Sequence, residues 1–176
     1  MDKFLRRRNL GDSDAIPSSG YYVYYYGTWN SDVGQFVKKG YERGGIATYS
    51  FESDHIRLYT NNPSVLSTNS SISIMSANKL DLSSYSTIHI LASYTPKNNN
   101  SMGGIMLTEK DTTSNNFNTS YGTRLELLVS GKTSIALSEW TEDISNYTYL
   151  SDCFICLVAD SWTGDTEVNV YAIWFD

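Results

Sequence analysis

Apolar and polar residues alternate along this chain in short runs that are separated by Gly, Asn, Ser and Asp. Such runs, with a period of two or continuously apolar, predict β-strands. No segment after residue 12 sustains a helical period with caps at both ends. The predicted strands are YYVYYY (21–26), IATYSF (46–51), HIRLYT (55–60), SISIM (71–75), TIHILASY (87–94), GIMLTE (104–109), TRLELLV (123–129), TSIAL (133–137), CFICLVA (153–159) and EVNVYAIWF (167–175).

Many short strands with turn signals between them predict an all-β fold, an antiparallel two-sheet β-sandwich of jelly-roll type. The absence of βαβ alternation and the presence of only three prolines argue against a parallel sheet. A charged fraction of 18% and 14 tyrosines are also typical of β-sheet proteins with polar, uncharged loops. A length of 176 residues suits one domain, so we expect a short N-terminal arm (1–20) followed by a sandwich (21–176).

One phrase occurs twice, as DLSSYS from Asp81 and as DISNYT from Asp143, and each copy precedes an apolar stretch. The acid and the hydroxyl groups can bond to nearby backbone N–H groups and hold a tight turn. The aliphatic residue and the tyrosine then point inward. We therefore expect two corners of the sandwich, with Tyr85 and Tyr147 as structural anchors whose rings are buried and whose hydroxyls reach the backbone.

The net charge of -6 is unevenly distributed. The first nine residues, MDKFLRRRN, carry +3, which leaves -9 for the remainder. An acidic body repels phosphate, so we expect no nucleic-acid binding. No apolar run is long enough to span a membrane, and none follows the cationic start as a secretion signal requires. The sequence therefore predicts a protein that stays in the compartment where it is made.

The two cysteines form a C-x-x-C at Cys153 and Cys156, within a predicted strand. Three residues of a strand separate the two Cα atoms by about 10 Å and place the side chains on opposite faces. A disulfide needs a much shorter separation. The histidines, His55 and His89, stand singly in apolar runs and supply no zinc set. We expect free thiols and no cofactor, while a structural Ca²⁺ held by loop oxygens stays open.

Catalytic motifs are missing from the sequence, which has no G-x-S-x-G, H-E-x-x-H, P-loop or G-x-G-x-x-G. Carboxylates such as Glu126, Asp160 and Glu167 could form a glycosidase pair only if folding brought them together. We expect a protein without enzymatic activity.

Several segments, in this order, carry a resemblance: YYVYYYGTWNSDVGQFVKKGYERGG, SFESDHIRLYT, KLDLSSYSTIHILAS, EDISNYTYLSDCFICLVAD and EVNVYAIWFD. This pattern resembles the β-sandwich structural proteins of bacteriophages and prophages of Firmicutes-type hosts, over about residues 21–176. The resemblance implies a virion structural protein, a tail, fibre or capsid-surface component with a shape akin to carbohydrate-binding modules. It also implies synthesis in the host cytoplasm, which suits a chain without a signal peptide.

Two functions from different classes follow. In the first, the sandwich is a virion building block, and a docking arm made of Phe4, Leu5, Arg6, Arg7 and Arg8 attaches it to other virion proteins or to further copies in a homo-oligomer. In the second, the chain is a non-catalytic carbohydrate-binding module that contacts host cell-wall glycans. The candidate glycan contacts are the aromatic residues beside turns or in apparent loops: Trp29, Tyr41, Trp140 and Trp162. The alternative for each is packing against an edge of the sandwich.

Overall fold

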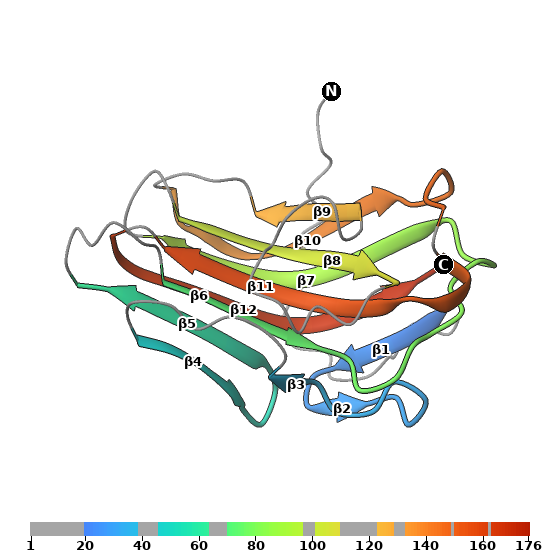
Figure 1. Cartoon of the computed structure of the whole chain (residues 1–176), viewed down its shortest axis with the longest axis horizontal. Coiled ribbons are helices and arrows are strands. Elements are labelled where there is room, and N and C mark those ends of the chain that lie inside the picture. Colours follow the sequence, from blue (N-terminus) through green and yellow to red (C-terminus); the bar gives the residue numbers. More distant parts are fainter. Residues whose placement is uncertain are drawn as a thin grey trace.

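The computed structural model is built from β-strands in two layers (Figure 1). It describes residues 20–38, 46–63, 70–96, 101–109, 123–128, 133–148, 150–161 and 163–176. One short 3-10 helix, η2 (Leu150–Asp152), interrupts the strands, and no helix in these ranges could cross a membrane. The strands are β1 (Tyr21–Tyr25), β2 (Thr28–Trp29), β3 (Val37–Lys38), β4 (Ile46–Phe51), β5 (Ile56–Asn62), β6 (Ser70–Met75), β7 (Thr87–Pro96), β8 (Met102–Thr108), β9 (Thr123–Leu128), β10 (Ile135–Asp143), β11 (Phe154–Ser161) and β12 (Gly164–Phe175).

All strand pairs are antiparallel and they form two sheets. Sheet A has seven strands: β10, β7 and β12 lie side by side, and β12 then pairs with β5 along its first half and with β1 along its second. β4 and β2 lie beyond β5 and β1, respectively. Sheet B has five strands in the order β3-β6-β11-β8-β9. The chain changes sheet between β5, β6, β7 and β8, and again between β9, β10, β11 and β12. The predicted all-β, two-sheet antiparallel sandwich is confirmed.

The main core lies between the sheets because alternate residues of each strand face inward. On β5, Ile56 and Leu58 are fully buried, while Arg57 and Tyr59 between them are partly exposed. Strands β7 and β12 repeat this pattern along most of their length. The strands of sheet B differ, because β6 and β11 bury residues of both parities. A second apolar cluster accordingly lies on the outward face of sheet B, formed by Met75, Met106, Cys156 and Val158.

The doubled phrase forms two corners with the same internal bonds. Asp81 Oδ1 accepts hydrogen bonds from the backbone N–H of Ser83, at 3.0 Å, and from its hydroxyl, at 2.6 Å. Asp143 Oδ1 accepts the same pair from Ser145, at 2.9 and 2.6 Å. These bonds lower the pKa of both carboxyl groups. In each copy the following aliphatic residue is fully buried: Leu82 in the first and Ile144 in the second.

The two corners lie together at one end of the β7–β10 pair. The backbone N–H of Ile144 donates to Ser86 O at 2.8 Å, and Asp143 is paired with Thr87 at the start of β7. The two copies therefore serve one joint: the first leads into β7, and the second leads out of β10 towards β11.

Tyr85 and Tyr147 are partly buried and pack against the main core. The ring centroid of Tyr85 lies 5.9 Å from that of Tyr21 and 6.1 Å from that of Phe175. Within the described ranges neither phenol makes the expected hydrogen bond to the backbone. The anchoring that the structure shows at these corners is ring packing, while the polar bonds come from Asp81 and Asp143.

Each of the ten predicted strands has a counterpart, although several ends differ. The largest difference is in β10, which was predicted to end at residue 137 and continues to Asp143. The polar residues in its second half mask the strand pattern, because β10 lies at the edge of sheet A and many of its side chains meet solvent. The two-residue strands β2 and β3 were not predicted, since such short bridges leave no period.

Candidate functional site

The outward face of sheet A carries a row of partly exposed polar and aromatic side chains. They come from alternate positions of the central strands: Arg57, Tyr59 and Asn61 on β5, Glu167, Asn169 and Tyr171 on β12, and Ser93 on β7. Strand pairing brings them together, because Asn169 lies opposite both Arg57 and Ser93, and Glu167 lies opposite Tyr59. We call these seven residues the outward row.

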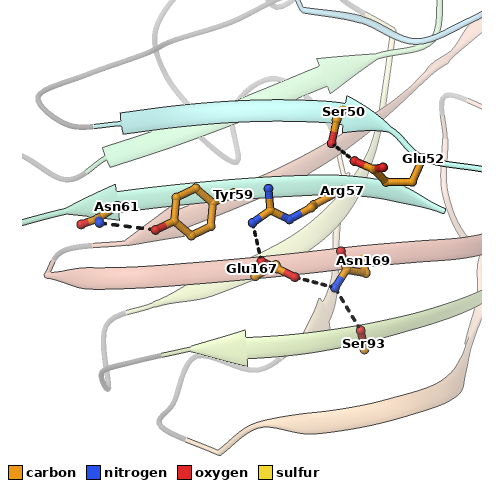
Figure 2. Close-up of polar contacts among 8 residues, drawn as sticks. All are labelled: Ser50, Glu52, Arg57, Tyr59, Asn61, Ser93, Glu167 and Asn169. Carbon is orange, nitrogen blue, oxygen red and sulfur yellow. Dashed lines mark hydrogen bonds and ion pairs between the residues drawn. The ribbon is translucent and has the colours of Figure 1, made fainter.

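A chain of hydrogen bonds crosses three strands within the outward row (Figure 2). Arg57 donates to Glu167 Oε2 at 2.6 Å, and Asn169 Nδ2 donates to Glu167 Oε1 at 2.9 Å. Asn169 Nδ2 also lies 3.5 Å from the Ser93 hydroxyl. Both oxygens of Glu167 are therefore engaged. Burial alone would raise the pKa of Glu167, but the bonds from Arg57 and Asn169 outweigh it and lower that pKa.

Two groups in this row keep hydrogen-bonding capacity, an acceptor on Asn169 and donors on Arg57, and of these the Arg57 donors are open to solvent. Asn169 Oδ1 is buried and makes no hydrogen bond within the described part of the chain. The Arg57 side chain is 35% exposed, although one of its nitrogens bonds Glu167. A guanidinium has five N–H donors in a fixed plane, so most of them can serve a further acceptor. The row is held in place by internal bonds and retains unused hydrogen-bonding capacity.

Aromatic rings flank the network at both ends. Tyr59 lies under the guanidinium of Arg57, with 4.9 Å from Cζ to the ring centroid, and its hydroxyl lies 3.4 Å from Asn61 Nδ2. Tyr171 lies on β12, four residues after Glu167, which is the strand partner of Tyr59. Four residues correspond to about 13 Å along the strand. The centroid of His55 lies 5.0 Å from that of Tyr171.

Tyr26 also lies beside Tyr171, and its backbone conformation is uncommon for a residue other than glycine. It has φ 41°, the left-handed region that is uncommon for residues other than glycine, and it is followed by Gly27 at φ 84° in the turn between β1 and β2. A side chain at Gly27 would meet Ser53 O at 2.2 Å. The ring centroid of Tyr26 lies 6.0 Å from that of Tyr171. Positive φ at both central residues is the geometry that a two-residue hairpin turn requires, and here it places the Tyr26 ring beside Tyr171.

Most of the residues predicted from sequence lie elsewhere. Trp29 packs between Tyr24, Phe36 and Phe51, with ring centroids at 4.7, 5.0 and 5.5 Å. Trp140 is not in a loop as expected: it lies in β10, opposite the buried Ile90, and packs against the main core. Both rings pack against the main core and remain partly exposed. Tyr41, Trp162 and the docking arm, Phe4, Leu5, Arg6, Arg7 and Arg8, lie outside the described residues.

Two of the carboxylates considered for a glycosidase pair, Asp160 and Glu167, lie in different sheets, while the side chain of Glu126 lies outside the described residues. Glu167 belongs to the outward row of sheet A, whereas Asp160 is buried in β11 and accepts a hydrogen bond from Ser71 on sheet B at 2.9 Å. The described residues contain no group of three or more His, Cys, Asp or Glu side chains suited to a metal ion.

The cysteines occupy different clusters. Cys153 lies in the main core and Cys156 in the apolar cluster on the outward face of sheet B. Both are free, and burial raises the pKa of each thiol to about 12. The prediction that the two thiols are unpaired and lie on opposite faces is confirmed.

Sequence reasoning missed the outward row because its members are spread over three strands. The alternation on β5 and β12 predicts that residues such as Arg57 and Glu167 face outward, but it does not pair the strands. The signal that could have been used is the outward aromatic residue in each strand, Tyr59 and Tyr171.

No protein family model matches the chain, and no curated protein does. Among solved structures, it is similar to a family 29 carbohydrate-binding module from Piromyces equi, with 16% identity, 89% of each chain covered and a TM-score of 0.49. A second family 29 module, solved in complex with cellulohexaose, matches with 8% identity, 92% of this chain and 93% of that chain covered, and a TM-score of 0.49. A domain of bacteriophage CBA120 tailspike protein 4 matches with 8% identity, 84% of this chain and 20% of that chain covered, and a TM-score of 0.42. At such identities the likeness concerns the fold.

Proposed function

We propose that the chain is a non-catalytic glycan-binding domain and that the outward row of sheet A holds the ligand. The observation that carries the proposal is a hydrogen-bonded network, Arg57–Glu167–Asn169, placed between partly exposed aromatic rings at Tyr59 and Tyr171. A pyranose ring presents apolar C–H groups on its faces and hydroxyl groups around its rim. Aromatic rings bind such faces, while the planar amide and guanidinium groups bind the hydroxyls.

Preorganisation supports this use of the surface. The side chains of Arg57 and Glu167 hold each other, so a ligand would not need to order two long side chains on binding. The row therefore has the two features expected of a ligand site, a fixed polar centre and apolar contact area beside it.

The charges around the row favour an uncharged glycan. Arg57, the cation of the outward row, is already paired with Glu167, and the carboxylates of Glu52, Asp54 and Asp165 belong to the adjoining loop and strand ends. An anionic polysaccharide would meet this negative charge without a free cation in the row. We expect neutral polysaccharides to bind better than uronate-containing or phosphorylated ones.

The experiment is affinity electrophoresis, followed by titration calorimetry, on a panel of neutral and anionic polysaccharides. Tyr171→Ala and Arg57→Gln should each weaken binding to a neutral polysaccharide by about tenfold or more, equal to about 1.4 kcal/mol. Unchanged affinity in both variants would contradict the proposal.

Lys79 provides a matched control for Arg57. Its Nζ lies 2.5 Å from Asp152 and 5.6 Å from the ring centroid of Phe154, so it makes the same kind of ion pair and cation–π contact outside the outward row. Its side chain is 34% exposed, against 35% for Arg57. Lys79→Gln should leave glycan affinity unchanged.

The sequence resemblance supports a second proposal, that the chain is a virion structural protein. It would be made in the host cytoplasm and attached to the particle through the docking arm, residues 4–8. A glycan-binding face would suit a virion protein that contacts a host wall. Deleting residues 1–12 should leave glycan affinity intact and abolish incorporation into the particle or a homo-oligomer. Assembly of the truncated protein at the normal level would contradict the docking role.

A further inference from the structure

Four buried hydroxyl groups gather at one end of the interior between the sheets. They belong to Thr60, Tyr94, Ser161 and Thr166, whose side chains are 0 to 1% exposed. Within the described part of the chain, none of the four oxygens has a hydrogen-bond partner. Buried polar groups are almost always paired, so four such groups in one place require an explanation.

The register places three of them side by side in sheet A. Thr166 on β12 lies opposite Thr60 on β5 and opposite Pro96 on β7. Tyr94 stands two residues before Pro96 and has the same inward orientation, next to Val168. Thr60 and Thr166 face the interior on the same side of their strands as the core residues Leu58 and Val168, and Tyr94 itself belongs to the main core.

Ser161 completes the group from the opposite sheet. It is the last residue of β11, and β12 begins at Gly164, so the chain passes between the sheets at this end. Its inward parity follows from Ala159, a member of the main core. Tyr94 faces the interior from sheet A, as Ser161 does from sheet B. The four hydroxyls therefore border one interior region from both layers.

The chemistry of this region favours a small neutral ligand. Hydroxyl groups both donate and accept, and the four of them carry no charge to balance a divalent cation. Asp160, the adjacent carboxylate, is on the outward parity of β11 and bonds Ser71 there. Water is the ligand that makes about three hydrogen bonds in a polar interior and occupies the least space.

We propose that ordered water molecules occupy the interior between Thr60, Tyr94, Ser161 and Thr166 and join the ends of the two sheets. Each water bridges hydroxyls that the strand geometry keeps from bonding one another. The site is separate from the outward row, since Tyr59 and Glu167 project from the opposite face of the same strands.

The first test uses the sign of a stability change. Valine has nearly the shape of threonine and lacks the hydroxyl. If water satisfies the hydroxyls, Thr166→Val and Thr60→Val should each lower the melting temperature by about 2 to 4 °C. If the hydroxyls are dry, removing them relieves a desolvation cost, and the same variants should melt at a higher temperature, which would overturn the proposal. Thr48→Val, on the exposed side of β4, is the control for valine in a strand.

The second test observes the water itself. Oxygen-17 relaxation dispersion of the folded wild-type protein should show long-lived internal water, and part of this signal should disappear in the Thr60→Val/Thr166→Val double variant. An equal signal in both proteins would overturn the proposal. A melting temperature that depends on whether the buffer cation is Na⁺ or K⁺ would also overturn it, because the ligand would then be an ion. Glycan affinity should be the same in all these proteins.

Discussion

The outward faces of the two sheets differ although both sheets enclose the same core. In sheet A this face carries partly exposed groups such as Arg57, Tyr59 and Glu167. In sheet B it carries Met75, Met106, Cys156 and Val158, each no more than 6% exposed. The described central strands of sheet B are thus buried on both sides, whereas sheet A has one partly exposed surface, where we propose that a ligand binds. This difference predicts that substitutions on the outward face of sheet B lower mainly the stability, whereas those on the outward face of sheet A lower mainly the affinity for a ligand.

The largest effect should come from shortening a side chain on the outward face of sheet B. Met106→Ala should cost about 2 to 5 kcal/mol of unfolding free energy, the range for a buried methionine. Tyr59→Ala on the outward face of sheet A should cost less than about 1 kcal/mol, as for surface positions. Chemical denaturation of both variants measures this contrast. Equal losses would mean that the two faces share one structural role.

A smaller effect is expected at the corners, where the two copies of the phrase can be compared. Tyr85→Ala should cost about 1 to 3 kcal/mol, because its ring contacts Tyr21 and Phe175. Tyr147→Ala should cost less, since within the described residues Tyr147 has no comparable ring contact. The phenylalanine variants should melt like the wild type, because neither hydroxyl has a hydrogen bond within the part of the chain that the structure describes. A clear loss in Tyr85→Phe, seen by thermal melting, would show that its hydroxyl anchors the corner after all.

A weaker, pH-dependent effect is expected at His89 on the outward face of sheet A. Its ring is stacked on Trp174 at 4.8 Å, with Nδ1 3.1 Å from Glu139 and Nε2 3.0 Å from Asp176, the latter an ion-pair contact without hydrogen-bond alignment. Burial opposes the charged form, but the two carboxylates outweigh it and raise the pKa of His89.

A raised pKa in the folded state gives stability that is fully present below the unfolded pKa of about 6.5 and is lost as the pH rises through the folded value. Denaturation of the wild type and His89→Gln between pH 5 and 8 should therefore differ most at pH 5, by less than about 1 kcal/mol. A difference that grows towards pH 8 would contradict the proposed ion pairs.

The smallest effect is expected for thiol labelling of the unmodified protein, which measures how accessible Cys153 in the main core and Cys156 on the outward face of sheet B are to solvent. Alkylation of the native protein should add no label, since Cys153 and Cys156 are both buried and their pKa is raised to about 12. The denatured, unreduced protein should take two labels by mass spectrometry. Rapid native labelling of Cys156 alone would show that the outward face of sheet B is open to solvent.

Local sequence determined the strands and the corners of this protein. Alternation of apolar and polar residues depends on neighbours two positions apart, so segments such as 46–51 were predicted with their observed ends. The corner bonds from Asp81 to Ser83 and from Asp143 to Ser145 are also local, which is why a repeated phrase predicts a repeated turn. The opposite orientations of Cys153 and Cys156 follow from the same periodicity.

Only the tertiary structure decided which strands are neighbours and therefore where a site lies. Arg57 and Glu167 are 110 positions apart, and their contact depends on the pairing of β5 with β12. The same holds for the four interior hydroxyls, which come from four strands in both sheets. The packing of Trp29 and Trp140 against the main core could not be predicted from a local pattern either, because the contacts of a ring come from distant segments. Strand order is set by the whole arrangement of buried surface, and a local pattern does not contain it.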